Sequence, residues 1–283
     1  AKKLNAPILL TQTDKLNKDT ASELSRLKPD IVYIIGGTGA VSKGVESQIS
    51  SMGFNYKRVY GADRYGTSSA IAGEMGNVSN AVIATGEDFP DALSIASWAA
   101  AKGAPILLVE KNNVPAEIER YIDKNKVNIS YVIGGSGVVS DTILKKFPGS
   151  RRLWGIDRYS TNIAVMKYLD NDFNYSNVFM STGENFPDAL AGSAMTAASK
   201  SPLLLVSIRS SGNTKKVVDS KSGMIKNVYL LGDNGALDNY TISKIMPSLI
   251  VGIDIGLPAA SVGPGKSMKA SINAVTVTGD RVQ

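Results

Sequence analysis

The stretch Thr85-Gly86-Glu87-Asp88-Phe89-Pro90-Asp91-Ala92-Leu93 returns at residues 182–190 with one change, Asn185 in place of Asp88. Three other motifs recur in the same order, at a period of about 95 residues. Their copies are a Gly-x-Asp-Arg-Tyr motif at 61–65 and 155–159, an apolar run at 6–10, 104–108 and 201–205, and a glycine-rich turn at 36–39, 134–137 and, more loosely, 232–235. Four motifs with one order and one spacing indicate that a single structural unit has been copied along the chain.

The period divides the chain into two complete units and two partial ones. Residues 56–150 and 151–248 each contain all four motifs. Residues 1–55 contain only the second half of a unit. The prolines and glycines of residues 249–283 predict a linker followed by the start of a further or split unit. We therefore expect an assembly of similar units.

Within one unit, apolar runs of strand length alternate with segments of helical periodicity. We predict strands at 80–85, 104–109 and 130–133, and helices at 91–102 and 116–125. The nearly continuous apolar run at 104–109 is typical of a strand that is buried on both faces, and we expect the copies at 6–10 and 201–205 to be core strands as well. Strands that alternate with helices through short connections favour right-handed β-α-β units around a parallel sheet. The predicted fold class is α/β, with tandem Rossmann-like or flavodoxin-like units.

The composition restricts the chemistry of any site. The chain has 283 residues, of which 43% are hydrophobic, so it can bury a core. It contains no His and no Cys, which excludes a Ser-His-Asp triad, a thiolate nucleophile and zinc sites built on these residues. No apolar run reaches the length of about 18 residues that a membrane span needs, so we expect no membrane insertion. No signal peptide follows Ala1, which predicts either an intracellular protein or a mature or trimmed form.

The net charge favours an anionic partner. Lys and Arg number 31 and Asp and Glu number 25, which gives a formal charge of +6. Nucleic acid, an anionic lipid surface and an acidic polysaccharide are all compatible with this modest excess. Charge alone does not choose among them.

The glycine-rich turn follows an apolar strand and opens a helix. Free backbone amides at such a place can hold a phosphate, as in dinucleotide-binding proteins. The third glycine of that fingerprint is replaced by Ser42 and Ser140, and no acidic residue ends the next strand. The alternative is a tight turn in which the two serines cap the helix. We expect no cofactor and no metal, and structural roles for Gly36, Gly37, Gly134 and Gly135.

The Phe-Pro-Asp motif ends with Asp91 and Asp188, at the predicted starts of two helices. Proline fits the first turn because its missing amide proton would be unpaired there, and the two aspartates interact favourably with the helix dipole. With Glu87 and Glu184 they could instead form carboxylate pairs for glycoside hydrolysis. The helix start explains the same residues more simply, so we expect structural aspartates and assign no catalytic residue.

The Asp-Arg-Tyr motif follows a strand and precedes a helix in both complete units. Arg offers a planar fork for carboxylate or phosphate groups, and Tyr offers a face for a sugar ring. Alternatively, Arg and the adjacent Asp form an ion-pair network that holds one unit against the next. Both roles can coexist in a protein of repeated units. We assign structural roles to Asp63 and Asp157, and candidate ligand-binding roles to Arg64, Tyr65, Arg158 and Tyr159.

The residues that follow the apolar run differ from unit to unit. They lie at the carboxyl ends of predicted strands, where α/β proteins usually bind ligands. A shared scaffold with variable edges suits related but non-identical binding sites. We therefore add Thr11, Lys111 and Arg209 to the candidate ligand-binding set, together with Trp154 as an aromatic that can pack on a sugar.

These motifs together resemble the cell-wall-binding type 2 repeat of Gram-positive surface proteins, which is frequent in clostridial S-layer and cell-wall proteins. The resemblance covers about residues 1–250, and the order of the motifs is specific. It implies three tandem Rossmann-like units packed as a pseudo-threefold assembly. It also implies a secreted protein of the cell wall or S-layer that is anchored non-covalently to an anionic secondary cell-wall polysaccharide. Other S-layer proteins are a further implied partner, and nucleic acid is not.

Two departures and two alternatives accompany this resemblance. The first unit lacks its Gly-x-Asp-Arg-Tyr and Phe-Pro-Asp half, and the third unit has Asp233 inside its glycine-rich turn. A wall-remodelling amidase or glycosidase would have to work with Asp, Glu, Ser, Lys or Tyr, or with an oxygen-ligated metal. A purely structural S-layer component would use Arg64 and Arg158 between units.

Overall fold

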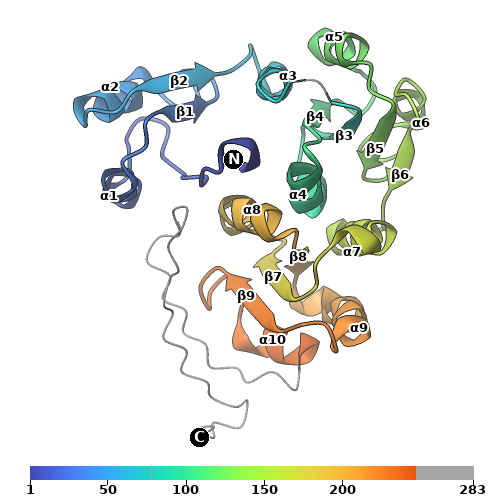
Figure 1. Cartoon of the computed structure of the whole chain (residues 1–283). Helices are drawn as coiled ribbons and strands as arrows, with labels where there is room; N and C mark the ends of the chain where they lie inside the picture. Colours follow the sequence, from blue (N-terminus) through green and yellow to red (C-terminus); the bar gives the residue numbers. More distant parts are fainter. Residues whose placement is uncertain (77, 247–283) are drawn as a thin grey trace, which may run out of the picture.

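Parallel strands form three separate sheets in the computed structural model, which describes residues 1–76 and 78–246. Each sheet belongs to one lobe of the molecule (Figure 1). We call these lobe 1 (residues 1–59), lobe 2 (64–153) and lobe 3 (158–246). The predicted linker and partial unit at 249–283 lie outside the described residues.

Lobe 2 is a complete unit with the parallel strand order β4-β3-β5-β6. Its elements are α3 (Arg64–Gly73), β3 (Asn80–Thr85), α4 (Pro90–Lys102), β4 (Ile106–Val109), α5 (Ala116–Asn125), β5 (Ile129–Ile133), α6 (Asp141–Leu144) and β6 (Arg151–Leu153). β3 and α5 have the bounds that the sequence predicts. Because β4 lies on one side of β3 and β5 on the other, the chain reverses its direction across the sheet between β3 and β5. Such a reversal is the point at which open α/β sheets bind ligands.

Lobe 3 repeats this arrangement with the parallel order β8-β7-β9. Its elements are α7 (Arg158–Tyr168), η2 (Asp170–Asp172), β7 (Asn177–Thr182), α8 (Pro187–Ser199), β8 (Leu203–Val206), η3 (Ile208–Ser210), α9 (Ser211–Lys221), β9 (Asn227–Leu231) and α10 (Asn239–Ile245). All four residues of β8 are buried, whereas in β4, for which the sequence predicts burial on both faces, Ile106 and Leu108 are half-buried.

Lobe 1 has a two-stranded sheet. Its elements are η1 (Lys2–Leu4), α1 (Lys18–Leu27), β1 (Val32–Ile35), α2 (Lys43–Ser51) and β2 (Tyr56–Val59). The apolar run at 6–10, predicted as a core strand from its copies, is not a strand here. The copies pair with β3 and β7, and the described part of lobe 1 holds no counterpart of these strands. Ile35 is consequently 47% exposed, whereas its counterpart Ile133 is fully buried.

The boundaries between the sheets lie one strand later in the chain than the boundaries between the sequence repeats. The period places β2 and β6 at the start of the second and third units. In the structure β2 pairs with β1 and β6 pairs with β5, so each strand closes the sheet of the preceding lobe. The connections at 60–63 and 154–157 then cross to the next lobe. This places Tyr60 and Trp154 at the carboxyl ends of β2 and β6.

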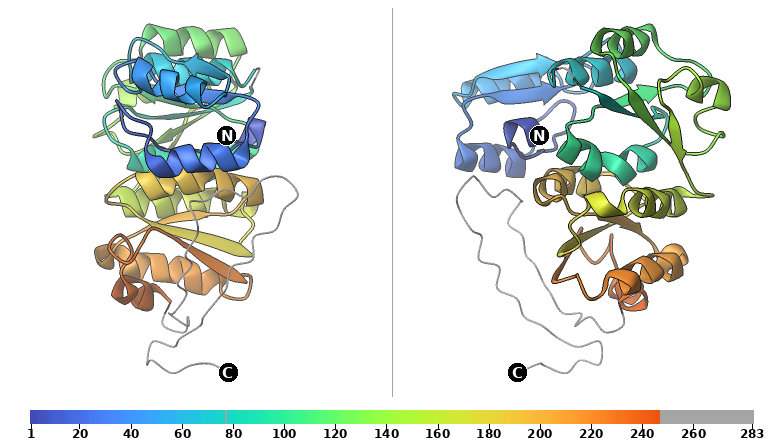
Figure 2. Two further views of the ribbon diagram at one scale, coloured as in Figure 1. Left: turned by 90° about the vertical axis from the view of Figure 1, so that its left-hand side faces the viewer. Right: turned by 45° about the vertical axis from the view of Figure 1, so that its right-hand side comes forward.

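Helices α4 and α8 pack against each other at the centre of the molecule, and η1 contacts both (Figures 1 and 2). Asn5 follows η1 with φ +48°, just as Gly103 and Lys200 follow α4 and α8 with φ +68° and +54°. In lobe 1, η1 therefore occupies the place of the last turn of this central helix. The predicted fold class is confirmed, because tandem α/β units with parallel sheets pack as a pseudo-threefold assembly.

One buried apolar cluster joins lobes 2 and 3. It contains Ile95 and Trp98 of α4 together with Met166 and Leu204 of lobe 3. Because the same core removes side chains of both lobes from water, it stabilises their relative position. None of the described helices is long and apolar enough to cross a membrane.

Candidate functional site

The aspartates of the two Asp-Arg-Tyr motifs are helix caps. Asp63 accepts a hydrogen bond from the backbone N–H of Gly66 at 2.8 Å, and Asp157 accepts one from Ser160 at 2.7 Å. Both have extended backbone conformations, as residues at this position usually do. The caps fix the starts of α3 and α7 and thereby the backbone positions of the Arg and Tyr residues that follow.

The two motif arginines bind the chain at the end of the central strand of their lobe. Arg64 donates from Nη1 to the carbonyl of Gly86 at 2.5 Å, and Arg158 donates in the same way to Gly183 at 2.6 Å. Arg158 also forms an ion pair with Asp88 of lobe 2 at 3.3 Å. The guanidinium of Arg158 lies 5.5 Å from the ring centroid of Phe89. Arg158 therefore connects lobe 3 to lobe 2.

The two motif tyrosines are buried, with 8% of each residue exposed. Tyr65 donates its hydroxyl to Glu87 at 2.5 Å, and Tyr159 donates to Glu184. Burial, together with the hydrogen bond to Glu87, raises the pKa of Tyr65 to about 12. Neither ring has a free face on which a sugar could stack. Of the three aromatic residues predicted to bind a ligand, the two tyrosines are buried and Trp154 is exposed.

The two glycines of the Thr-Gly-Glu sequences are required by these tyrosines. A Cβ atom at Gly86 would overlap the ring of Tyr65, and one at Gly183 would overlap the ring of Tyr159. The motifs at 61–65 and 85–93 therefore contact each other, through Tyr65 on one side and Gly86 and Glu87 on the other. Much of the repeated sequence serves to assemble each unit.

The Phe-Pro-Asp aspartates lie in the first turns of α4 and α8, as predicted. Oδ2 of Asp91 is close to Gly134, and Oδ2 of Asp188 is close to Gly232. Burial raises the pKa of both carboxyls, and the charge of Asp88 adds to this effect at Asp91. Within the described part of the chain neither carboxylate accepts a hydrogen bond.

The acidic pairs considered for hydrolysis have separate partners. Glu87 accepts from Tyr65, whereas Asp91 faces the glycine-rich turn. No group of three or more acidic side chains among the described residues is placed to hold a metal ion.

Two arginines that sequence reasoning missed hold the glycine-rich turns. Arg152 donates to the carbonyls of Gly134 at 2.7 Å and Val139 at 2.8 Å. Arg58 makes the same two bonds in lobe 1, to Gly36 at 2.5 Å and Val41 at 2.8 Å. Their sequence signal is an arginine two residues before an aromatic, at positions 58 and 152, which are 94 residues apart and close to the period of the motifs.

Two of the glycines in these turns have a left-handed backbone conformation. Gly36 and Gly134 have φ values of +109° and +105°, which favour glycine. Ser140 accepts a hydrogen bond from the N–H of Ile143 at 3.4 Å and caps α6. Ser42 stands at the N-cap of α2 without a side-chain hydrogen bond.

The remaining candidates lie near the carboxyl ends of the strands. Trp154 is 54% exposed and lies beside Gly135 of the glycine-rich turn. Lys111 is exposed, and its carbonyl accepts from the N–H of Ser140 at the far end of the same turn. Trp154 and Lys111 therefore lie at the two ends of the segment 134–140.

The other two edge candidates differ from these. Thr11 is half-buried and donates to the carbonyls of Gln12 and Lys15 within its own loop. Arg209 is exposed on η3 in lobe 3. The structure therefore brings Trp154 and Lys111 to one turn and leaves Thr11 and Arg209 in other lobes.

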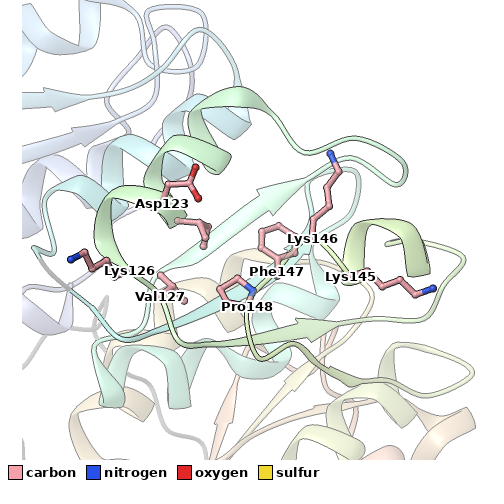
Figure 3. A pocket seen from close by; sticks show the side chains of 8 residues that line it. Asp123, Lys126, Val127, Lys145, Lys146, Phe147 and Pro148 are labelled. Carbon is pink, nitrogen blue, oxygen red and sulfur yellow. The ribbon is translucent and has the colours of Figure 1, made fainter.

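A lysine-lined hollow of about 400 Å³ lies at the opposite edge of lobe 2, before the starts of β5 and β6 (Figure 3). Its lining residues are Ile122, Asp123, Lys126, Val127, Lys145, Lys146, Phe147 and Pro148. Lys126 and Lys145 lie on opposite sides of Pro148 and have no ion-pair partner among the described residues. Lys146 forms an ion pair with Glu119 at 3.2 Å.

Two proteins of Bacillus subtilis resemble this chain in sequence. The chain is 32% identical over 242 residues to the N-acetylmuramoyl-L-alanine amidase LytC of Bacillus subtilis, which covers 85% of this chain and 48% of the relative. It is 38% identical over 209 residues to the amidase enhancer of the same organism, covering 73% and 28%. The chain thus spans less than half the length of these relatives.

Solved structures show the same fold. Cwp6 from Clostridium difficile matches with a TM-score of 0.76 and 30% identity, over 86% of this chain and 40% of that protein. Cwp8 matches with a TM-score of 0.73 and 26% identity, over 87% and 43%. The model of the family described as Cell wall binding domain 2 (CWB2) matches residues 1–46, 58–144 and 152–242. The chain therefore belongs to the CWB2 family of cell wall binding domains.

Proposed function

We propose that this chain anchors a surface protein non-covalently to a Gram-positive cell wall by binding an anionic secondary wall polysaccharide. Its family supports cell-wall binding. The preference for an anionic polymer rests on the hollow of lobe 2, which Lys126, Lys145 and Lys146 line together with Phe147 and Pro148 (Figure 3). A secreted protein in the wall or S-layer, with S-layer proteins as neighbours, follows from the same proposal.

The charges of the hollow suit a flexible polyanion. Lys126 and Lys145 are exposed and unpaired within the described structure, so an incoming phosphate or carboxylate displaces no internal ion pair. Asp123 is the one acidic residue that lines the hollow, so cations predominate. Attraction between exposed charges acts over a Debye length of about 8 Å at physiological salt.

Repetition strengthens such binding. Several weak sites on one rigid body can engage successive parts of the same polymer, and each later contact is then intramolecular. The shared core of lobes 2 and 3 fixes these two lobes relative to each other. Tight attachment therefore needs no single deep pocket.

A wall-remodelling hydrolase is the second candidate, because one relative carries the name of an amidase. The alignment with it covers 48% of that protein, and the amidase enhancer is matched over 28%. The binding proposal accounts for this chain as a module that longer proteins of different activity share. A peptidoglycan hydrolysis assay separates the two, since turnover above buffer would support the enzyme.

The test of anionic binding compares two double variants with equal charge loss. Lys126→Gln with Lys145→Gln removes the unpaired cations of the hollow, and Lys18→Gln with Lys43→Gln removes two exposed cations of lobe 1. We expect retention on purified walls to fall with rising salt, and to fall more for the first variant. Equal retention of both variants, or retention that ignores salt, would contradict the anionic preference.

A further inference from the structure

Two exposed aromatic residues occupy equivalent places in lobes 1 and 2. Tyr60 follows β2 directly and is 58% exposed, and Trp154 follows β6 directly and is 54% exposed. Both precede the glycine of a Gly-x-Asp-Arg-Tyr motif. An aromatic that stays exposed at the carboxyl end of a strand, in two copies of one unit, is not explained by packing of the core.

Each aromatic ring lies against the second glycine of the neighbouring glycine-rich turn. A Cβ atom placed on Gly37 would be 3.8 Å from Cδ2 of Tyr60, and one on Gly135 would be 3.6 Å from Cε3 of Trp154. The ring therefore contacts a stretch of bare backbone on one side, while more than half of the residue remains open to solvent. Because Gly37 and Gly135 have no side chain, neither residue covers the ring that lies beside it.

The turns that support these rings are held in place. Arg58 and Arg152 each bind two carbonyls across the turn, and both arginines are also paired with an acidic residue, Glu46 at 2.7 Å and Asp141 at 3.0 Å. A fixed support is what a stacking surface needs, since little conformational entropy is then lost when a ligand binds. Aromatic residues supply large contact areas of this kind.

We propose that Tyr60 and Trp154 are two stacking subsites for sugar rings of the wall polysaccharide, an inference that rests on the proposed function. The exposed C–H face of a pyranose would lie on the free side of each ring. In lobe 2 the carboxylate of Asp91 faces the same turn and has no hydrogen-bond partner among the described residues, so it can accept from a sugar hydroxyl. The subsite in lobe 2 thus combines an apolar face with an acceptor.

Lobe 3 does not repeat this surface. Asp233 replaces the glycine that supports the ring in the other two lobes. Its carboxylate accepts from the N–H groups of Gly235 at 2.9 Å and Ala236 at 3.0 Å, so it belongs to the turn itself. The proposal therefore assigns two stacking subsites to the described chain, in lobes 1 and 2.

The chain offers a direct spectroscopic test. It contains two tryptophans, of which Trp98 is 4% exposed and donates from Nε1 to Asp172 at 2.8 Å. An aqueous quencher such as iodide therefore reaches mainly Trp154. Soluble polysaccharide released from purified walls should protect Trp154 from the quencher in the wild-type protein.

Variants then separate stacking from other contacts. Trp154→Ala and Tyr60→Ala should each weaken binding of the released polysaccharide about three- to tenfold, and Trp154→Tyr should restore most of it. Tyr240→Ala is the matched control, because Tyr240 is 62% exposed on α10 and lies outside both subsites. Circular dichroism confirms that each variant is folded.

The outcomes distinguish this proposal from the function on which it rests. Suppose that the wild-type protein binds walls, that Trp154→Ala and Tyr60→Ala bind equally well, and that Trp154 is not protected from the quencher. This result overturns the stacking subsites and leaves the proposed function standing. Wild-type protein that does not bind walls overturns both. Loss in Tyr240→Ala equal to that in Trp154→Ala also contradicts the assignment.

Discussion

Nη2 of Arg158 lies 3.3 Å from Oδ2 of Asp88, and this ion pair joins lobes 2 and 3 through two residues that are 70 positions apart in the sequence. The same guanidinium lies over the ring of Phe89 and binds the carbonyl of Gly183. Arg64 makes the corresponding carbonyl bond within its own lobe. The two motif arginines therefore share one contact and differ in the other.

This difference predicts unequal costs of substitution. Arg158→Ala should lower the free energy of unfolding by about 2 kcal/mol, and Arg64→Ala by about 1 kcal/mol, because only Arg158 also loses an ion pair and a cation–π contact. Denaturant unfolding measures both. If both variants remain folded and lose wall binding, the arginines are ligands and the structural assignment is contradicted.

The two hydrogen bonds from Arg152 to the glycine-rich turn predict a larger loss of stability on substitution. Arg152→Ala leaves the carbonyls of Gly134 and Val139 without their donor, and we expect a loss of about 2–4 kcal/mol. Arg151→Ala is the control, since Arg151 is exposed and its partner is the hydroxyl of Tyr168. An equal shift of the unfolding temperature in the two variants would contradict a stabilising role for the Arg152 hydrogen bonds.

The exposure of equivalent isoleucines gives a third prediction. Ile133→Ala should cost about 2–5 kcal/mol, because Ile133 is fully buried in β5. Ile35→Ala should cost less than about 1 kcal/mol, because Ile35 is 47% exposed in β1. A similar loss in both variants would show that the β1 surface is covered in solution.

The buried tyrosines predict a loss of stability in alkali. The pKa of Tyr65 rises from 10.0 to about 12, so between these values the unfolded chain releases a proton that the folded chain retains. Stability is therefore fully present below pH 10.0 and falls as the pH rises toward 12. Tyr65→Phe should show a smaller fall than the wild-type protein in denaturant unfolding at pH 9 and pH 11. An equal fall would contradict the shifted pKa.

The carboxyl of Asp91 predicts opposite effects on stability and binding. Its pKa is raised by burial, so the folded state disfavours the charge that it carries at neutral pH. Asp91→Asn should raise the free energy of unfolding at pH 7 and weaken polysaccharide binding. Higher stability with unchanged binding would show that Asp91 is not a ligand.

The regular elements of the complete units could be predicted because their signals are local. The strand at 80–85 and the helix at 116–125 have the predicted bounds, since periodicity within each segment determines its type. The apolar run at 6–10 does not form a strand, although its sequence predicts one. A strand needs a neighbouring strand to pair with, and the described part of lobe 1 contains no counterpart of β3 or β7.

The candidate site was harder to predict because its contacts are long-range. The bonds from Tyr65 to Glu87 and from Tyr159 to Glu184 span 22 and 25 positions, and periodicity gives no sign of them. Arg152 binds the carbonyls of Gly134 and Val139, which precede it by 18 and 13 positions. Tyr60 and Trp154 differ in residue type, so their equivalence becomes clear only from their shared place beside the turn.

Binding to walls before and after chemical removal of the anionic polymer tests the central claim most directly. We expect the folded chain to sediment with untreated purified walls and to stay in solution with stripped walls. Equal retention on both, or no retention on either, would contradict anchoring through this polymer.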